Sequence, residues 1–221
     1  MVSGLPRETA CLNSVVGEPR EFKTAAGVGP KRAEKAARAF VDAGADALMS
    51  FGLAGGLSPA VPAGTIVLAT RIVDGQTIYP VDEAWLSRIE VTLNKFGPFV
   101  KGPIVGVDVL LSSPKKKESL HYLTKALACD MESHAVARIA ALNEIPFVSI
   151  RAVSDPHNRY VPDWVTGCLT SVGDVRLGLL IWELARRPFS LGDIIGLSRD
   201  ARMAFDSLRS VAFCLGPQLR F

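Results

Sequence analysis

Two carboxylates lie at predicted element boundaries and are the strongest candidates for chemistry. Asp155 follows the apolar run 146–153, and burial at a strand end raises the pKa of a carboxyl, so that it can act as a general acid. Glu132 lies near a predicted helix start, where its carboxylate can accept paired hydrogen bonds from a vicinal diol such as a ribose. The structural alternatives are an ordinary Asp-Pro turn for Asp155 and a carboxylate that stabilises the helix N-terminus for Glu132.

Two glycine-rich segments are candidates for ligand contact. Gly27-Val28-Gly29-Pro30 precedes a predicted helix, whose backbone N–H groups can approach an anion. A dinucleotide fingerprint is rejected because it needs a third glycine and residue 32 is arginine. The segment 52–56 is predicted to be a loop after a strand. Each segment alone is also typical of a tight turn, but two such strand ends in one domain predict a shared ligand cleft.

The composition excludes several classes of protein. The net charge of +3 is too small to indicate nucleic-acid binding. The four cysteines and three histidines show no metal-ligand spacing, so we expect no metal and reduced thiols in a cytoplasmic protein. No apolar run near the start suits a signal peptide. The segment Lys115-Lys116-Lys117 is predicted to be a solvated face.

Strands and helices alternate through the first part of the chain, which predicts an α/β fold in a single domain, 1–221. In such folds ligands bind beyond the carboxyl ends of the strands, where Asp155 and the segment 52–56 lie. The expected strands are 47–51, 64–72, 102–111 and 146–153. The expected helices are 30–43, 85–96, 115–125 and a run from Glu132 to about Asn143.

The C-terminal part, 172–221, is expected to be a helical extension. Two helices are predicted, 172–187 and 191–212, the second with an apolar stripe that includes Leu197, Ala204 and Leu208. The first interpretation is that they pack on the domain or on a partner subunit. The second is peripheral membrane contact, since a cationic amphipathic helix can lie in a membrane interface.

Three segments together carry a family resemblance: SFGLAGGLSPAVPAGTIVLAT (50–70), GVDVLLSSPKKKESL (106–120) and ACDMESHAVARIAALNEIPFVSIRAVSD (128–155). They resemble the purine nucleoside phosphorylase / methylthioadenosine nucleosidase superfamily. The start VSGLPRE and the arginine-rich C-terminal helices are similar to its hopanoid-associated phosphorylase branch.

The resemblance implies a three-layer α/β/α fold with a central mixed, partly barrel-like sheet and cleavage of a purine–ribose bond. It implies that Asp155 donates a proton to purine N7 and that Glu132 holds the ribose hydroxyls, with Met131 against the sugar. The further residues that it implies are Ala54 and Gly55 at the base and ribose, Gly27 near the nucleophile, and Val109 and Leu110 beside the base.

Two departures from the family pattern affect the nucleophile. Phosphorolytic relatives place arginine and serine where this chain has Ser50 and Leu53, which favours water over phosphate, although phosphate stays open as a co-substrate. Glu8 is the candidate that activates water, with its spacing from Gly4 shifted by one residue.

The branch resemblance implies adenosylhopane, a lipid-linked nucleoside, as the substrate in hopanoid biosynthesis. The alternatives are a nucleosidase for methylthioadenosine or adenosylhomocysteine, a phosphate-dependent phosphorylase, and a nucleoside-binding protein without turnover. We expect no cofactor, no nucleic-acid partner and a homo-oligomer.

Overall fold

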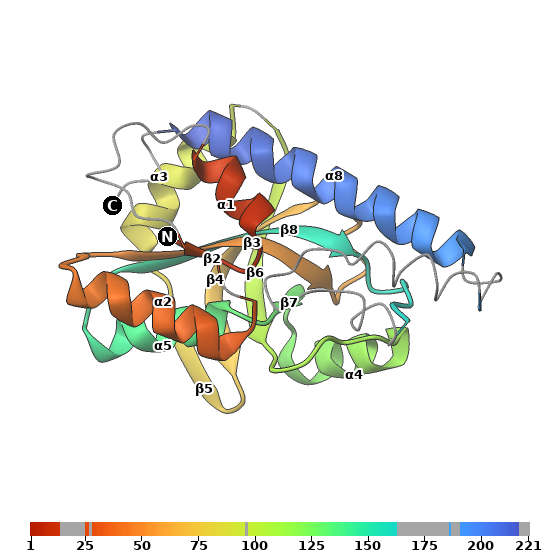
Figure 1. The fold of residues 1–221 in the computed structure, drawn as a ribbon, viewed down its shortest axis with the longest axis horizontal. Helices are drawn as coiled ribbons and strands as arrows, with labels where there is room; N and C mark the ends of the chain where they lie inside the picture. Colours follow the sequence, from red (N-terminus) through yellow and green to blue (C-terminus); the bar gives the residue numbers. More distant parts are fainter. Residues whose placement is uncertain (14–24, 27, 96, 163–185, 187–190, 217–221) are drawn as a thin grey trace.

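The computed structural model describes residues 1–13, 25–26, 28–95, 97–162, 186 and 191–216 (Figure 1). One mixed sheet of eight strands forms the centre of this part of the chain. In chain order the strands are β1 (Val2–Ser3), β2 (Ala25–Ala26), β3 (Leu48–Gly56), β4 (Ile66–Asp74), β5 (Thr77–Pro80), β6 (Phe99–Gly106), β7 (Ala128–Asp130) and β8 (Phe147–Asp155).

Five of the strands close into a barrel. β3 pairs with β7, β7 with β6, β6 with β4, β4 with β8, and β8 pairs back to β3. The β3–β8 pair is parallel and runs from Leu48↔Phe147 to Gly55↔Asp155. The carboxyl ends of β3 and β8 therefore meet at one edge of the sheet.

Helices cover the barrel on two sides (Figure 1). They are α1 (Pro6–Asn13), α2 (Pro30–Asp42), α3 (Glu83–Leu93), α4 (Pro114–Thr124), α5 (Ser133–Leu142) and α8 (Leu191–Leu215). α2 packs on α5 on one side, whereas α8 crosses the other side and packs against β8. The predicted α/β fold with a partly barrel-like mixed sheet is confirmed.

The helices begin and end at residues whose chemistry favours a boundary. The Asp82 and Ser113 side chains accept hydrogen bonds from the first turns of α3 and α4. Pro30 opens α2, and Gly44 adopts a φ of +85° just beyond its end, an angle that glycine tolerates best.

Two expected boundaries were wrong. The segment 52–56 is the second half of β3 and not a loop, because its backbone pairs with β8 and β7 in spite of its glycines. The strand expected at 102–111 covers 99–106 and ends at Gly106.

The two helices predicted in the C-terminal part have different outcomes. The helix predicted at 172–187 lies outside the described residues, apart from residue 186. The helix predicted at 191–212 is confirmed as α8, where Ala204 and Leu208 of the predicted stripe are fully buried. In the part of the chain that the structure describes, no helix is both long and apolar enough to span a membrane.

Candidate active site

Asp155 is the last residue of β8, at the edge where β8 pairs with β3. It is 8% exposed. Its neighbour on β3 is Gly55, where a Cβ would lie 3.1 Å from Asp155 Oδ2, so the glycine makes room for the carboxyl. Asp155 therefore presents its carboxyl at the end of a buried strand, as the sequence predicts.

Two side chains hold the Asp155 carboxyl. Lys117 of α4 donates to Oδ2 at 2.5 Å, and the Ser154 hydroxyl donates to Oδ1 at 2.8 Å. Burial raises the pKa of Asp155, although both contacts oppose that rise. The raised pKa favours a protonated carboxyl, which is the form that can donate.

Glu8 lies in the first turn of α1 and reaches the middle of β3. Its carboxylate accepts hydrogen bonds from the N–H of Leu5 at 2.7 Å and of Leu53 at 2.8 Å. A Cβ at Gly52 would lie 2.8 Å from the Glu8 carboxylate, so only glycine allows this approach. Burial raises the pKa of Glu8 against these hydrogen bonds.

Glu132 stands at the N-cap position of α5, but its side chain does not cap that helix. It accepts a hydrogen bond from the Gly29 N–H at 2.8 Å, at the start of α2. Asp130 does the capping, since its Oδ1 accepts from the N–H groups of Glu132 and Ser133. The Glu132 carboxylate therefore makes no capping hydrogen bond to α5, although it stands at the start of that helix. Burial raises the pKa of Glu132 to about 7, and the nearby charges of Asp130 and Glu8 add to the rise.

A buried arginine balances this group of acids. Arg151 of β8 donates from Nε to Asp130 Oδ2 at 2.6 Å, and from Nη2 to Ser50 Oγ at 2.6 Å and Ser133 Oγ at 2.9 Å. The Arg151 charge also opposes the rise in the pKa of Glu8 and Glu132. Neither Arg151 nor Asp130 was predicted from the sequence as a site residue; the one available signal was a charged residue inside the apolar run 146–153.

The remaining predicted residues lie on three segments. Ala54 is buried in β3, and Met131 is half-buried between β7 and α5. Leu110 is 40% exposed in the segment that follows β6. Gly27 lies outside the described residues.

The segment that holds Leu110 lies beside the chain that follows Asp155. The Val161 N–H donates to the Ser112 carbonyl at 2.8 Å, and Lys117 contacts the carbonyls of Asp155 and Pro156 at 3.1 Å each. Residues 107–113 and 156–161, named here the two walls, are thus joined by a backbone hydrogen bond, and the second follows Asp155 directly in the chain.

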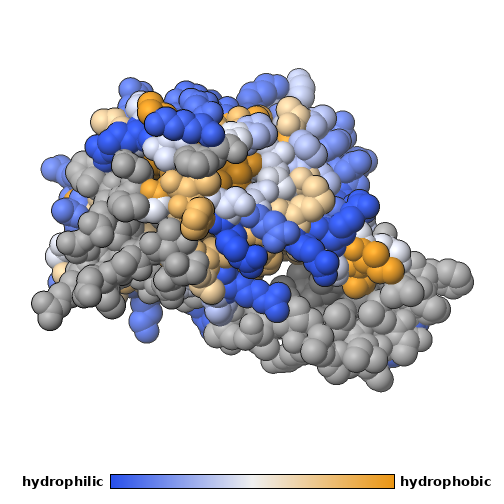
Figure 2. Space-filling model, turned by 90° about the horizontal axis from the view of Figure 1, so that it is seen from above, coloured by the Kyte–Doolittle hydropathy of each residue, from blue (hydrophilic) through white to orange (hydrophobic). Residues whose placement is uncertain are grey.

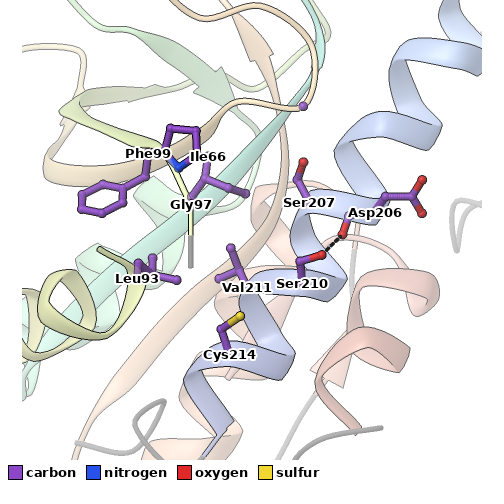
Figure 3. A pocket seen from close by; sticks show the side chains of 11 residues that line it. Ile66, Leu93, Gly97, Phe99, Asp206, Ser207, Ser210, Val211 and Cys214 are labelled. Carbon is purple, nitrogen blue, oxygen red and sulfur yellow. Dashed lines mark hydrogen bonds between the residues drawn. The ribbon is translucent and has the colours of Figure 1, made fainter. Parts of the chain in front are cut away.

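A separate cavity of about 350 Å³ lies between α8 and the beginnings of β4 and β6 (Figure 3). Its walls are mainly apolar and include Ile66, Leu93, Phe99 and Val211. Neither Asp155, Glu132 nor Glu8 lines it. Asp206 is the charged residue in its wall, so it lacks the group of acids described above. Among the described residues no cluster of His, Cys, Asp and Glu side chains is arranged to hold a metal ion.

The arrangement has two useful chemical capacities. Asp155 can donate a proton to a leaving group, which stabilises the negative charge that develops there. Glu132 can accept hydrogen bonds from hydroxyl groups. Glu8 approaches β3 at Gly52, three residues before Gly55, where Asp155 approaches the strand. Three residues of a strand span about 10 Å, which is the scale of a nucleoside.

Comparison with known sequences identifies a family. The sequence model described as Phosphorylase superfamily matches residues 15–166. The 5′-methylthioadenosine/S-adenosylhomocysteine nucleosidases of Mycobacterium bovis and Mycobacterium tuberculosis are each 28% identical to this chain over 177 residues, which cover 62% of this chain and 69% of theirs.

Solved structures show the same fold. The Helicobacter pylori 5′-methylthioadenosine/S-adenosylhomocysteine nucleosidase has a TM-score of 0.72 at 14% identity, with 99% of this chain and 95% of that chain covered. The Neisseria meningitidis nucleosidase, in complex with methylthio-immucillin-A, has a TM-score of 0.71 at 18% identity, with 98% and 97% covered. At such identities the likeness shows the fold alone.

Proposed function

Since this chain belongs to the phosphorylase superfamily, we propose that it cleaves the N-glycosidic bond of an adenosine-containing substrate and releases adenine. The observation that carries the proposal is the buried acid Asp155 on one sheet edge, held by Lys117 and Ser154, with Glu132 and Glu8 buried nearby. Such an acid can protonate a leaving purine in hydrolysis and in phosphorolysis alike.

Asp155 acts on the leaving base. As the bond from the base to C1′ stretches, positive charge grows on the sugar and negative charge on the purine. Transfer of the Asp155 proton to N7 neutralises the leaving base, and one well-placed acid contributes about 10²–10⁴-fold to the rate. Ala54 and Gly55 of β3 line this part of the site.

Glu132 and Met131 position the sugar. The Glu132 carboxylate accepts hydrogen bonds from the 2′- and 3′-hydroxyls, in place of or beside the Gly29 N–H that it contacts now. Met131 packs against the ribose. Holding C1′ still relative to the acid lowers the entropy cost of the reaction.

We propose water as the nucleophile, activated by Glu8. The raised pKa of Glu8 brings a carboxylate closer to the range in which it can accept a proton at neutral pH. Ser50 is buried and bonded to Arg151, and the Leu53 side chain offers no donor, which supports hydrolysis over phosphorolysis. Gly27 is the residue that we expect nearest the nucleophile. We propose no cofactor, with phosphate as the alternative co-substrate.

We propose adenosylhopane as the substrate. The two walls expose apolar side chains outward, with Val109 68% and Tyr160 47% exposed, and Leu110 lies next to Val109. Exposed apolar side chains of this kind suit a substrate that carries a large hydrophobic group. A nucleosidase for 5′-methylthioadenosine or S-adenosylhomocysteine is the second candidate, which the names of the relatives favour.

Two proposals concern the surroundings of the enzyme. We propose a cytoplasmic homo-oligomer, with peripheral membrane contact through the C-terminal helices. On α8, Ile195, Met203 and Phe213 are exposed. Figure 2 shows hydrophobic residues in small groups among hydrophilic ones on the face that it views, so membrane contact there would be local.

The test measures free adenine from purified protein. Adenosylhopane in detergent, 5′-methylthioadenosine and S-adenosylhomocysteine are each incubated with and without phosphate. We expect adenine from adenosylhopane without phosphate. Release only with phosphate would contradict hydrolysis, and release only from the small nucleosides would contradict the lipid substrate. Binding of adenosine compounds without any release would favour the non-catalytic alternative.

A further inference from the structure

The prediction that Lys117 belongs to a solvated face is wrong. Its neighbours Lys115 and Lys116 are exposed, as the predicted solvated face requires, but the Lys117 side chain is 0% exposed. α4 begins at Pro114, capped by Ser113, and its fourth residue points inward to the end of β8. A buried ammonium is costly unless it is paired and hydrogen-bonded, so its partners need to be identified.

Every N–H of the Lys117 ammonium has an acceptor. Nζ donates to Asp155 Oδ2 at 2.5 Å, to the Asp155 carbonyl at 3.1 Å and to the Pro156 carbonyl at 3.1 Å. An ammonium group has three donors, and all three are directed at the one residue that ends β8 and at the next. The lysine therefore fixes both the backbone and the side chain of Asp155.

We propose that Lys117 is the positioning residue of the acid in this site, an inference that rests on the proposed function. Lys117, a charged donor, holds Oδ2, whereas Oδ1 accepts only from the neutral Ser154 hydroxyl among the described groups, so Oδ1 is the oxygen that carries the transferable proton. During the reaction the Oδ1–H bond breaks and an N7–H bond forms on the leaving base. The carboxylate that remains is stabilised by the Lys117 ammonium.

The other groups around Asp155 do not supply a positive charge. Ser154 is a neutral donor to Oδ1, and the Cys129 thiol of β7 stays neutral because burial raises its pKa to about 12. Asp200 of α8 is negative and is paired with Arg159 at 2.7 Å. Among the described groups that act on Asp155, Lys117 is the cation in contact with it.

The experiment compares Lys117→Met with Lys116→Met, the same change one residue away at an exposed position. We expect Lys117→Met to lower kcat by about 10²-fold, the low end of what one acid contributes. Without the cation the pKa of Asp155 rises, so the alkaline limb of the kcat/KM profile moves up by about one unit or more. Lys116→Met is expected to match the wild-type protein in both respects.

A second variant and a second readout keep the test decisive. Lys117→Arg keeps the charge, so its alkaline limb is expected to stay near that of the wild-type protein even if Lys117→Met does not fold. Titration of the Asp155 carboxyl by ¹³C NMR reports the same pKa change without turnover. An unchanged alkaline limb, or an unchanged carboxyl titration, in Lys117→Met would overturn the inference. Absence of adenine release by the wild-type protein would instead contradict the proposed function, and the NMR titration would then decide the role of Lys117 alone.

Discussion

Single residues show how two buried carboxyls of the candidate site acquire different properties. Asp155 faces an ammonium group, whereas Glu132 faces a backbone N–H and the charges of other acids. The Lys117 contact holds the Asp155 carboxyl in place and opposes its protonation, while burial favours it. Among the described residues, the Glu132 carboxylate accepts from the Gly29 N–H alone, so it has acceptor capacity left, as a ligand for hydroxyl groups requires.

Replacement of Asp155 by asparagine is expected to affect both activity and stability. Adenine release should fall by about 10²–10⁴-fold, because the acid is lost. Where Asp155 is ionised, at high pH, the free energy of unfolding should also fall, because asparagine leaves the buried Lys117 ammonium without a counter-charge. Adenine assays and urea unfolding of Asp155→Asn measure the two effects. Asp46→Asn, at an exposed aspartate far from Asp155 in the sequence, is the control, and full activity in Asp155→Asn would refute the assignment of the acid.

The sequence predicted the candidates but not the residues that balance their charge. Asp155 and Glu132 were identified because a strand end and a helix start are visible in the sequence. Arg151 and Lys117 were not, because nothing local distinguishes a basic residue that faces solvent from one whose head group is buried. Their roles depend on partners distant in sequence: 38 positions separate Lys117 from Asp155, and 101 separate Arg151 from Ser50.

Among the elements, β3 does most to shape the site. Its glycines allow two acids to approach it, Glu8 at Gly52 and Asp155 at Gly55. From the sequence, these glycines predicted a loop. In the fold they lie in a strand, because pairing with β8 and β7 compensates for their low strand propensity, and such pairing is not visible locally.

Replacement of Gly52 by alanine tests this function of β3. The new Cβ would lie 2.8 Å from the Glu8 carboxylate and must push it aside. A displacement of about 1 Å can cost about 10²-fold in rate, so we expect kcat to fall by that order. Gly97→Ala is the matched control, since a Cβ there meets no atom within 4 Å. Equal kcat values for the two variants would show that the position of Glu8 does not matter.

For the whole molecule, alternation of strands and helices was enough to predict the α/β class, but not the closure of the sheet. Closure depends on the antiparallel pair of β4 with β8, which joins Ile66 to Ala152. Glu8, Glu132 and Asp155 are all buried in the described part of this closed fold, with few cations near them. Their charges must therefore influence the stability of the entire fold.

The free energy of unfolding is expected to fall as the pH rises from mildly acid to neutral. Folded Glu132 has a pKa of about 7, against an ordinary value of 4.5, so between these values the folded chain holds a proton that the unfolded chain has lost. The associated stability is fully present below pH 4.5 and is lost as the pH approaches 7, a loss of about 3 kcal/mol. Glu8 and Asp155, whose pKa values are also raised, act in the same direction, whereas the lowered pKa of Asp130 opposes them only in stronger acid.

Replacement of Glu132 by glutamine isolates this contribution. Glutamine resembles the protonated acid and still offers an oxygen to the Gly29 N–H, so we expect the variant to be more stable than the wild-type protein at pH 8 and nearly equal to it at pH 4.5. Urea unfolding at several pH values measures the difference, with Glu118→Gln as an exposed control. Adenine release should fall at the same time, because the amide binds hydroxyl groups less strongly than a carboxylate does. A variant both more stable and less active would mean that the fold keeps a destabilising charge because the substrate requires it. A variant with unchanged stability at pH 8 would mean that the Glu132 charge is balanced within the folded protein.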